Sequence, residues 1–468
     1  MSTAVPELAD RAAACADHLR VADRVLLASH IDADGLTSAA VAATALQRAG
    51  IPFETVFEKQ LDAEAIAAIA ETDYDTVLFT DFGSGQLDVI ADHERRGAFT
   101  PVVADHHQPA DAETDLHLNP LLVGVNGAKE LSGAGAAYVL ARELGGEANR
   151  DLAALAVVGA VGDMQATDDG LVGANAAIVR EGCEVDVLSE TTDLALYGKQ
   201  TRPLPKLLEY ATEAGIPGVS GDEAGAIRFL EGLDLDLSAD GEWRTWVDLS
   251  VEERREVTSA LVRRAVERGV PSEKVESLVG QTYTLPAEPE GTELRDASEF
   301  STLLNATARY DRADVGLAVC LGDRAAALDR ARQLLRAHRR NLSEGVRWVE
   351  QHGVTREDNL QWFDAGTEIR ETIVGIVAGM AVGAPGVDRG VPIVAFARKS
   401  ETETKVSSRG TGRLVGRGLD LSRVMREAAR AVGGDGGGHD VAAGATIPAG
   451  EEDAFVARAD QIVGEQLS

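Results

Sequence analysis

The chain is poor in cysteine and aromatic residues. Its 468 residues include three cysteines, and aromatic side chains make up 4% of the total. Cys15, Cys183 and Cys320 are scattered along the chain and match no zinc-binding spacing. This pattern excludes a zinc finger and is typical of reduced thiols in a cytoplasmic protein.

Long apolar runs are also missing. The sequence contains no run of about twenty apolar residues, so we expect no membrane span and no membrane partner. Residues 1–7 lack a basic region followed by an apolar one, and we therefore expect no signal peptide. Both features favour a cytoplasmic location.

Lysine is scarce for a chain of this length. It supplies seven of the 45 basic residues, arginine supplies 38, and the net charge is −32. An acidic, lysine-poor surface resembles adaptation to high cytoplasmic salt, as in haloarchaea. The alternative is an ordinary acidic protein that avoids nucleic acid. In molar salt the Debye length falls to about 3 Å, so the acidity argues only weakly against a nucleic-acid substrate.

The pattern along the chain predicts three parts. Residues 1–204 alternate short apolar strands with alanine-rich helices, which is typical of a parallel α/β sheet. Residues 205–354 are densely charged with helical periodicity, and residues 355–468 predict a smaller α/β domain. We expect strands at 25–29, 53–57, 77–80 and 101–104, and helices at 37–49 and 63–70.

Acidic residues and histidines follow several of these apolar segments. His30-Ile31-Asp32-Ala33-Asp34-Gly35, Asp81 and Asp105-His106-His107 each follow an expected strand, and Asp163 closes the apolar segment 155–162. Ligand sites in open α/β sheets form beyond the carboxyl ends of the strands. So many carboxylates repel one another unless cations compensate them. A mixed set of aspartates and histidines suits Mn²⁺ better than Mg²⁺ or Zn²⁺.

These four segments resemble the DHH phosphoesterase superfamily, in the family's order and spacing. The domain order is similar to that of archaeal RecJ-like single-strand exonucleases, including the GINS-associated nuclease. The resemblance implies that Asp81 bridges two metal ions. The other implied metal ligands are His30 and Asp32 on one ion, and Asp34, His106 and Asp163 on the other.

Two further residues of this site are expected to act in catalysis. Asp105 would orient a neighbouring imidazole, because ligating histidines usually have a carboxylate or carbonyl partner. His107 would face the phosphate as a hydrogen-bond donor or general acid. Residues 132–138 open a helix that we expect to pack close to the metal ions.

The C-terminal part resembles the domain associated with DHH proteins. Lysine, serine, arginine and glycine gather there in two short segments. Glycine lets backbone amides approach an anion, and arginine offers a fork to a phosphate. The expected substrate-binding residues are Lys405, Ser407, Ser408, Arg409, Gly437, Gly438 and His439.

Two other basic segments have open interpretations. Arg330, Arg332, Arg336, Arg339 and Arg340 form either a track for a nucleic-acid backbone or a connector helix that is salt-bridged to acidic neighbours. Residues 198–203 resemble a loop of the archaeal relatives, and their basic pair could reach the substrate.

We therefore expect a two-metal exonuclease acting on single-stranded DNA or RNA in replication or repair. The GINS complex is a candidate partner. One alternative is a phosphodiesterase for short oligonucleotides or cyclic dinucleotides, against which the 205–350 segment argues. The other is a GINS-binding replication scaffold without catalysis, against which the complete motifs argue.

Overall fold

The computed structural model describes residues 5–467 except 168, 213 and 240. The chain divides into two compact units, residues 1–332 and 333–468. Each unit has its own β-sheet and its own apolar core. Within the described residues, no helix combines the length and the apolar composition needed to cross a bilayer.

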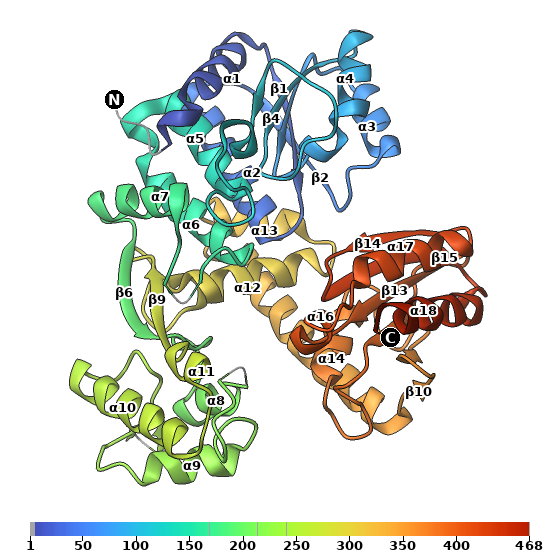
Figure 1. Cartoon of the computed structure of the whole chain (residues 1–468). Helices are drawn as coiled ribbons and strands as arrows, with labels where there is room; N and C mark the ends of the chain where they lie inside the picture. Colours follow the sequence, from blue (N-terminus) through green and yellow to red (C-terminus); the bar gives the residue numbers. More distant parts are fainter. Residues whose placement is uncertain (1–4, 168, 213, 240, 468) are drawn as a thin grey trace. The chain divides into compact units, whose positions relative to one another are not determined.

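A five-stranded parallel sheet lies in the first unit, in the order β2-β1-β3-β4-β5 (Figure 1). All four expected strands are present, each one residue longer than predicted, and β5 is added at the edge. The α/β fold class is confirmed. The strands are β1 (Val25–His30), β2 (Phe53–Glu58), β3 (Thr76–Thr80), β4 (Thr100–Ala104) and β5 (His117–Leu118).

Helices cover both faces of this sheet. Successive side chains of a strand point to opposite faces, so each face can pack against helices. Leu26 and Phe79 pack on one face against Ile66 of α3 and Ile90 of α4. Helix α2 packs with β1 on the other face and also contacts α5 and α6. The helices are α1 (Ala9–Val21), α2 (Ala33–Ala49), α3 (Ala63–Ala70), α4 (Leu87–Arg95), α5 (Gly133–Gly145), α6 (Ala153–Gly162) and α7 (Gly173–Glu184).

A mostly helical insert lies between two paired strands of the first unit. Strands β6 (Ser189–Leu194) and β9 (Val279–Thr284) pair antiparallel, and Figure 1 shows α8 to α11 beyond them. Trp246 and Leu261 are buried in the core of the insert. The elements of the insert are α8 (Leu204–Glu209), α9 (Glu223–Glu231), β7 (Ser238–Ala239), β8 (Glu242–Trp243), α10 (Val251–Glu267) and α11 (Ser272–Glu276).

Three helices follow the insert, and the last one runs into the second unit. They are α12 (Ala297–Ala308), α13 (Ala313–Cys320) and α14 (Ala326–His352). Short 3₁₀ helices are η1 (Pro6–Leu8), η2 (Ser84–Gln86), η3 (Pro120–Val123), η4 (Gly146–Leu152) and η5 (Glu293–Arg295).

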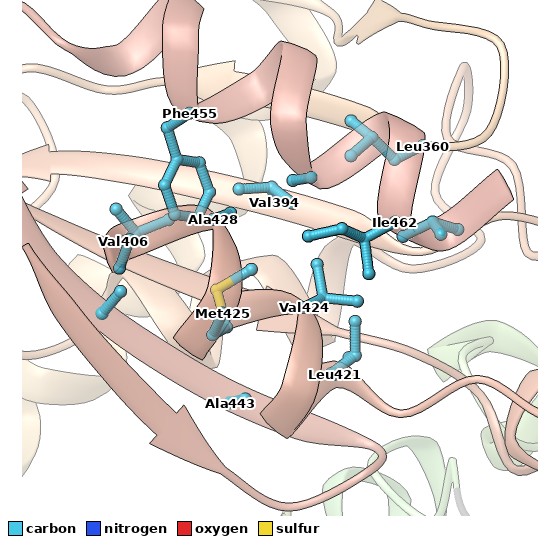
Figure 2. Packing of buried hydrophobic residues seen from close by; sticks show 14 of the residues in the cluster. Leu360, Val394, Val406, Leu421, Val424, Met425, Ala428, Ala443, Phe455 and Ile462 are labelled. Atoms are coloured by element: carbon cyan, nitrogen blue, oxygen red, sulfur yellow. The ribbon is translucent and has the colours of Figure 1, made fainter. Parts of the chain in front are cut away.

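The second unit has a six-stranded mixed sheet in the order β10-β11-β12-β13-β15-β14. Figure 2 shows Val394 and Val406 of this sheet packed with Met425 and Phe455. The elements are β10 (Thr355–Arg356), β11 (Gln361–Asp364), α15 (Val374–Ala381), β12 (Ile393–Arg398), β13 (Glu403–Arg409), α16 (Gly412–Val415), α17 (Leu421–Ala431), β14 (Asp435–Gly438), β15 (Ala442–Pro448) and α18 (Glu452–Leu467).

Candidate metal centre

Three parallel strands of the first unit deliver polar side chains to one edge of the sheet. His30 ends β1, Asp81 follows β3, and Asp105 follows β4. The strands are neighbours in the sheet and run in the same direction, so their carboxyl ends meet. The sequence prediction that these residues gather is therefore confirmed.

The end of β1, the turn after it and the start of α2 contribute three potential ligands, His30, Asp32 and Asp34. Asp32 caps α2 by accepting from the Gly35 amide at 3.0 Å. Its Oδ1 lies 3.2 Å from His30 Nδ1. Asp34 is buried, and its oxygens accept from the amides of Gly133 at 2.7 Å and Ala134 at 2.9 Å. The helix start expected near the metal ions thus contacts a potential ligand directly.

Asp81 stands between two groups of potential ligands. Its Oδ2 lies 3.6 Å from His30 Nδ1, and its Oδ1 lies 3.3 Å from His106 Nε2. Its φ of 59° is left-handed, a conformation that aspartate and asparagine tolerate better than most residues. A Cβ at Gly133 would collide with Asp81 Oδ1, so glycine is needed there for the close approach of α5.

Asp105 is fully buried, and hydrogen bonds occupy both of its oxygens. Oδ1 accepts from the His106 amide at 2.7 Å and from His107 Nδ1 at 2.8 Å, and Oδ2 accepts from the Ser84 amide at 2.9 Å. Asp105 thereby fixes the tautomer of His107, whose side chain is 56% exposed.

His106 presents its second nitrogen to the carboxylates. Its Nδ1 donates to the Gly127 carbonyl at 2.7 Å, which leaves Nε2 to face Asp81 at 3.3 Å and Asp34 at 3.8 Å. A backbone carbonyl on the far nitrogen is the usual support of a metal-binding histidine.

Asp163 joins the cluster from a helix rather than from a strand. It follows α6 and lies 3.8 Å from His106 Nδ1, while Gln165 Nε2 donates to its Oδ2 at 2.8 Å. Segment 155–162 is therefore helical, so Asp163 reaches the strand ends through the packing of α6 on α2.

The pKa shifts in this cluster indicate that its carboxylates favour positive charge nearby. Burial raises the pKa of Asp34 well above its usual value, and the charge of Asp81 raises it further. Burial alone would lower the pKa of His30, but the carboxylates of Asp32 and Asp81 outweigh it and raise that pKa to about 11. Burial alone would also lower the pKa of His106, but the carboxylates of Asp81, Asp34 and Asp105 outweigh it and raise that pKa to about 11.

The residues fit the binding of divalent cations. Potential ligand atoms form three overlapping groups, each within 4.8 Å: His30, Asp32 and Asp81; Asp34, His106 and Asp163; and Asp81, Asp105, His106 and His107. Among the described residues, Asp81 Oδ1 and His106 Nε2 are buried without a hydrogen-bond partner. The two atoms face each other at 3.3 Å, and a cation bound to both would satisfy them. Carboxylate and imidazole donors together suit Mn²⁺, and carboxylates also bind Mg²⁺.

A pocket of about 410 Å³ opens onto this cluster. Lys59 lines it together with His107, although no motif marked Lys59 in the sequence. Helix α12 also reaches the cluster: Asn305 Oδ1 accepts from the Ala33 amide at 3.0 Å, and the charge of Arg309 acts on Asp32. Sequence analysis missed Asn305 and Arg309 because they lie far along the chain from residues 30–35.

The substrate-binding residues expected on β13 lie on both faces of that strand. Lys405, Ser407 and Arg409 lie on one face. Ser408 points to the other face, where it is fully buried and its hydroxyl donates to Ala443 O at 3.2 Å. Ser408 is therefore separated from the expected substrate-binding set. Arg409 lies against Gly375 of α15.

Glycines continue that face across the sheet. Ser407 is in register with Gly444 of β15, and Gly444 is in register with Gly437 of β14. Gly438 ends β14, and the exposed His439 follows it. The two segments singled out in the sequence thus belong to one sheet, on strands β13 and β14, with β15 between them.

The other basic segments already have contacts inside the first unit. Lys199 is buried with its Nζ 3.4 Å from Asp193 Oδ2, and the Arg202 guanidinium lies 4.7 Å from the centroid of the Tyr197 ring. On α14, Arg332 pairs with Glu293 at 2.5 Å. The salt-bridged interpretation therefore holds for Arg332.

Family models match three segments of the chain. The N-terminal domain of the DHH family matches residues 24–160, the DHH-CID domain matches 196–279, and the DHHA1 domain matches 363–465. An uncharacterized protein of Methanocaldococcus jannaschii is 31% identical over 447 residues, which cover 94% of this chain and 93% of that protein.

Solved structures share the fold at low sequence identity. RecJ from Thermus thermophilus in complex with Mn²⁺ has a TM-score of 0.61 at 18% identity, covering 98% of this chain and 55% of that one. This chain thus spans about half the length of that RecJ. CDC45 from Entamoeba histolytica has a TM-score of 0.67 at 12% identity, covering 97% and 99%. RecJ from Thermus thermophilus in complex with Mg²⁺ has a TM-score of 0.54 at 17% identity, covering 98% and 52%.

Proposed function

The chain belongs to the DHH family, and on that basis we propose that it is a metal-dependent phosphodiesterase that acts as an exonuclease on single-stranded nucleic acid. One observation carries the proposal. Two complete groups of ligand atoms meet at Asp81, whose oxygens face one group each. Catalytic pairs of divalent cations in phosphate-transferring enzymes need such a shared carboxylate between ligands on either side.

Each residue of the cluster then has a role. His30 and Asp32 would hold one cation, Asp34, His106 and Asp163 would hold the other, and Asp81 would contact both. The cations, Mn²⁺ or Mg²⁺, would polarise the scissile phosphate and offset its charge. The amides at the start of α5 keep Asp34 in position, and the Gly127 carbonyl orients His106.

His107 is the candidate proton donor. Its hydrogen bond with Asp105 raises the pKa of His107, which favours the protonated imidazole that a proton donor needs. Nδ1 donates to Asp105, and Nε2 is the nitrogen left to donate to the leaving oxygen of the substrate. Asp105 acts as a positioning residue, because its buried oxygens are all hydrogen-bonded within the protein.

The second unit offers a surface for a substrate phosphate. Lys405, Ser407 and Arg409 share one face of β13, and Gly437 lies on the same row as Ser407, with Gly444 of β15 between them. A guanidinium can bind a phosphate through two parallel hydrogen bonds. Gly438 and His439 would bound the same surface, and Ser408 would brace the strand from its buried face.

A scaffold role in replication is the second candidate, favoured by the similarity of fold to CDC45. A scaffold does not need buried groups of potential metal ligands, whereas this chain retains them around Asp81 and His106. We therefore place catalysis first. Binding of a replication partner such as the GINS complex is compatible with catalysis.

The test is digestion of single-stranded DNA and RNA labelled at either end, with Mn²⁺, Mg²⁺ or EDTA, at several salt concentrations. We expect mononucleotides released from one end, only with a divalent cation. The Asp81→Asn variant is the matched control for contaminating nucleases. Metal-independent cleavage, or equal cleavage by this variant, would refute the proposal.

A further inference from the structure

A second pocket, of about 360 Å³, lies beside the candidate metal centre in the first unit. Its walls come from the end of α6, the segment after β6, strand β9 and the first residues of α12. Asp163 lines the first pocket and its neighbour Met164 lines the second. Consecutive Cα atoms are about 3.8 Å apart, so segment 161–166 is a wall shared by both pockets.

The walls of this second pocket are largely apolar and partly aromatic. Tyr197 and Tyr283 line it, and Met164 is 89% exposed on a left-handed backbone with φ of 58°. An exposed methionine and an aromatic ring that line one pocket both gain from a flat apolar group that covers them. Arg202 over the Tyr197 ring holds that side chain in place.

The ammonium group of Lys199 borders the pocket, and among the described residues not all of its hydrogen-bond donors have a partner. Lys199 is 4% exposed, and its ammonium has three donors. Within the described part of the chain, its one hydrogen bond is the 3.4 Å contact to Asp193 Oδ2. A buried ammonium in this state favours an acceptor oxygen on whatever fills the pocket.

The two pockets differ in charge. Carboxylates dominate the first pocket, whereas the second contains Lys199 and Asp296, whose charges offset each other. A phosphate would face Asp296 without a metal to compensate it. An uncharged, planar group with an acceptor edge is the better match.

We propose that the second pocket binds a nucleobase of the single-stranded substrate, in the nucleotide next to the scissile phosphate. The base lies against Tyr197 and Met164, and a carbonyl oxygen on its edge accepts from Lys199. This inference rests on the proposed phosphodiesterase function and adds a base-binding subsite to it. It predicts that kcat/KM and affinity depend on the base next to the scissile bond, and not only on the backbone.

The test combines a pocket-filling variant with abasic substrates. Ala195 lines the pocket and is exposed, so Ala195→Trp fills the space without disturbing the core. Val21→Trp adds the same bulk at an exposed position of α1 and is the matched control. Oligonucleotides carry one abasic residue at successive positions from the cleaved end. We measure kcat/KM with Mn²⁺, and binding by anisotropy with Ca²⁺.

Wild type and Val21→Trp should lose about tenfold in kcat/KM and in affinity when one particular position is abasic, since stacking of a base on an aromatic side chain has that magnitude. Ala195→Trp should show the same loss on the intact oligonucleotide and no further loss at that position. On a fully abasic oligonucleotide the three proteins should be equal.

Two results would overturn the proposal: no position-specific abasic penalty in wild type, or a full penalty that persists in Ala195→Trp. Failure of the phosphodiesterase function is distinguishable, because wild type would then cleave no substrate. The binding measurement does not depend on cleavage and would still report whether Ala195→Trp removes recognition of the base.

Discussion

Asp81 combines a charge that the metal centre needs with a backbone conformation that few residues accept. Asp81→Asn keeps the shape and the left-handed conformation but removes the charge. We expect metal-dependent cleavage to fall to background. In the metal-free protein the substitution removes the repulsion between Asp81 and Asp34, and it also removes the ion pairs of Asp81 with His30 and His106, so these effects on stability oppose each other.

Asp81→Ala serves as the comparison for strain. It removes the same charge but places alanine at a φ of 59°, which costs about 1–2 kcal/mol. Thermal unfolding in EDTA should therefore rank Asp81→Asn above Asp81→Ala, with both inactive. Metal-dependent cleavage near the wild-type rate in either variant would contradict the assignment of Asp81 as the shared ligand.

His117 makes the stability of the first unit depend on pH. Burial lowers its pKa to about 4, and its Nε2 lies 2.9 Å from the Ser84 hydroxyl. The unfolded chain takes up the proton near the usual value of 6.5, so protonation favours unfolding. Stability should fall as pH drops from about 6.5 to 4, by up to about 3 kcal/mol from this group.

The measurement for His117 is urea unfolding between pH 4 and 8. His117→Gln keeps a hydrogen-bonding side chain but cannot titrate, so its stability should change less over this range than that of wild type. An unchanged pH slope in the variant would show that other groups cause the acid instability.

At the scale of elements, α5 approaches the metal centre only because its first residue has no side chain. A Cβ at Gly133 would collide with Asp81 Oδ1. Gly133→Ala should weaken Mn²⁺ binding and cleavage at least about tenfold, the order of loss seen when a metal's supporting shell is disturbed. Isothermal titration with Mn²⁺ measures the change. Gly412→Ala, where a Cβ meets nothing within 4 Å, is the control and should bind metal normally.

Strand β13 carries the phosphate-binding prediction for the second unit. Arg409→Ala should lower kcat/KM about tenfold or more, because a charge-assisted, two-pronged contact to phosphate is removed. The metal content should stay unchanged, since Arg409 belongs to a different unit from the metal ligands. Arg413→Ala, an exposed arginine of α16, is the matched control. Loss of bound metal or unchanged kinetics would count against this role.

At the scale of the whole molecule, the net charge of −32 should make stability depend on salt. Repulsion between carboxylates destabilises the folded chain in dilute buffer, and at about 1 M salt the Debye length shrinks to about 3 Å. The melting temperature in EDTA should therefore rise steeply from about 0.1 M to molar KCl. An uncharged osmolyte at equal osmolality is the control. A flat or falling curve would contradict the predicted adaptation to high salt.

The sequence alone determined the parts of the protein that depend on local pattern. Alternating strands and helices at residues 25–104 predicted the parallel sheet, because this alternation is typical of strands joined by crossover helices. The residues from His30 to Asp34, Asp81 and Asp105 to His107 were predicted together for the same reason. Parallel strands carry whatever follows them to one edge of the sheet.

Only the tertiary structure decided how distant segments complete that edge. Asp163 arrives from the helix α6, Asn305 arrives from α12, and Gly127 supplies a carbonyl to His106. The second pocket likewise needs segments 161–166, 195–199 and 281–283 side by side. These approaches depend on side-chain packing between elements that are far apart in the chain. No local pattern encodes such packing, because its free energy comes from surfaces that meet only after folding.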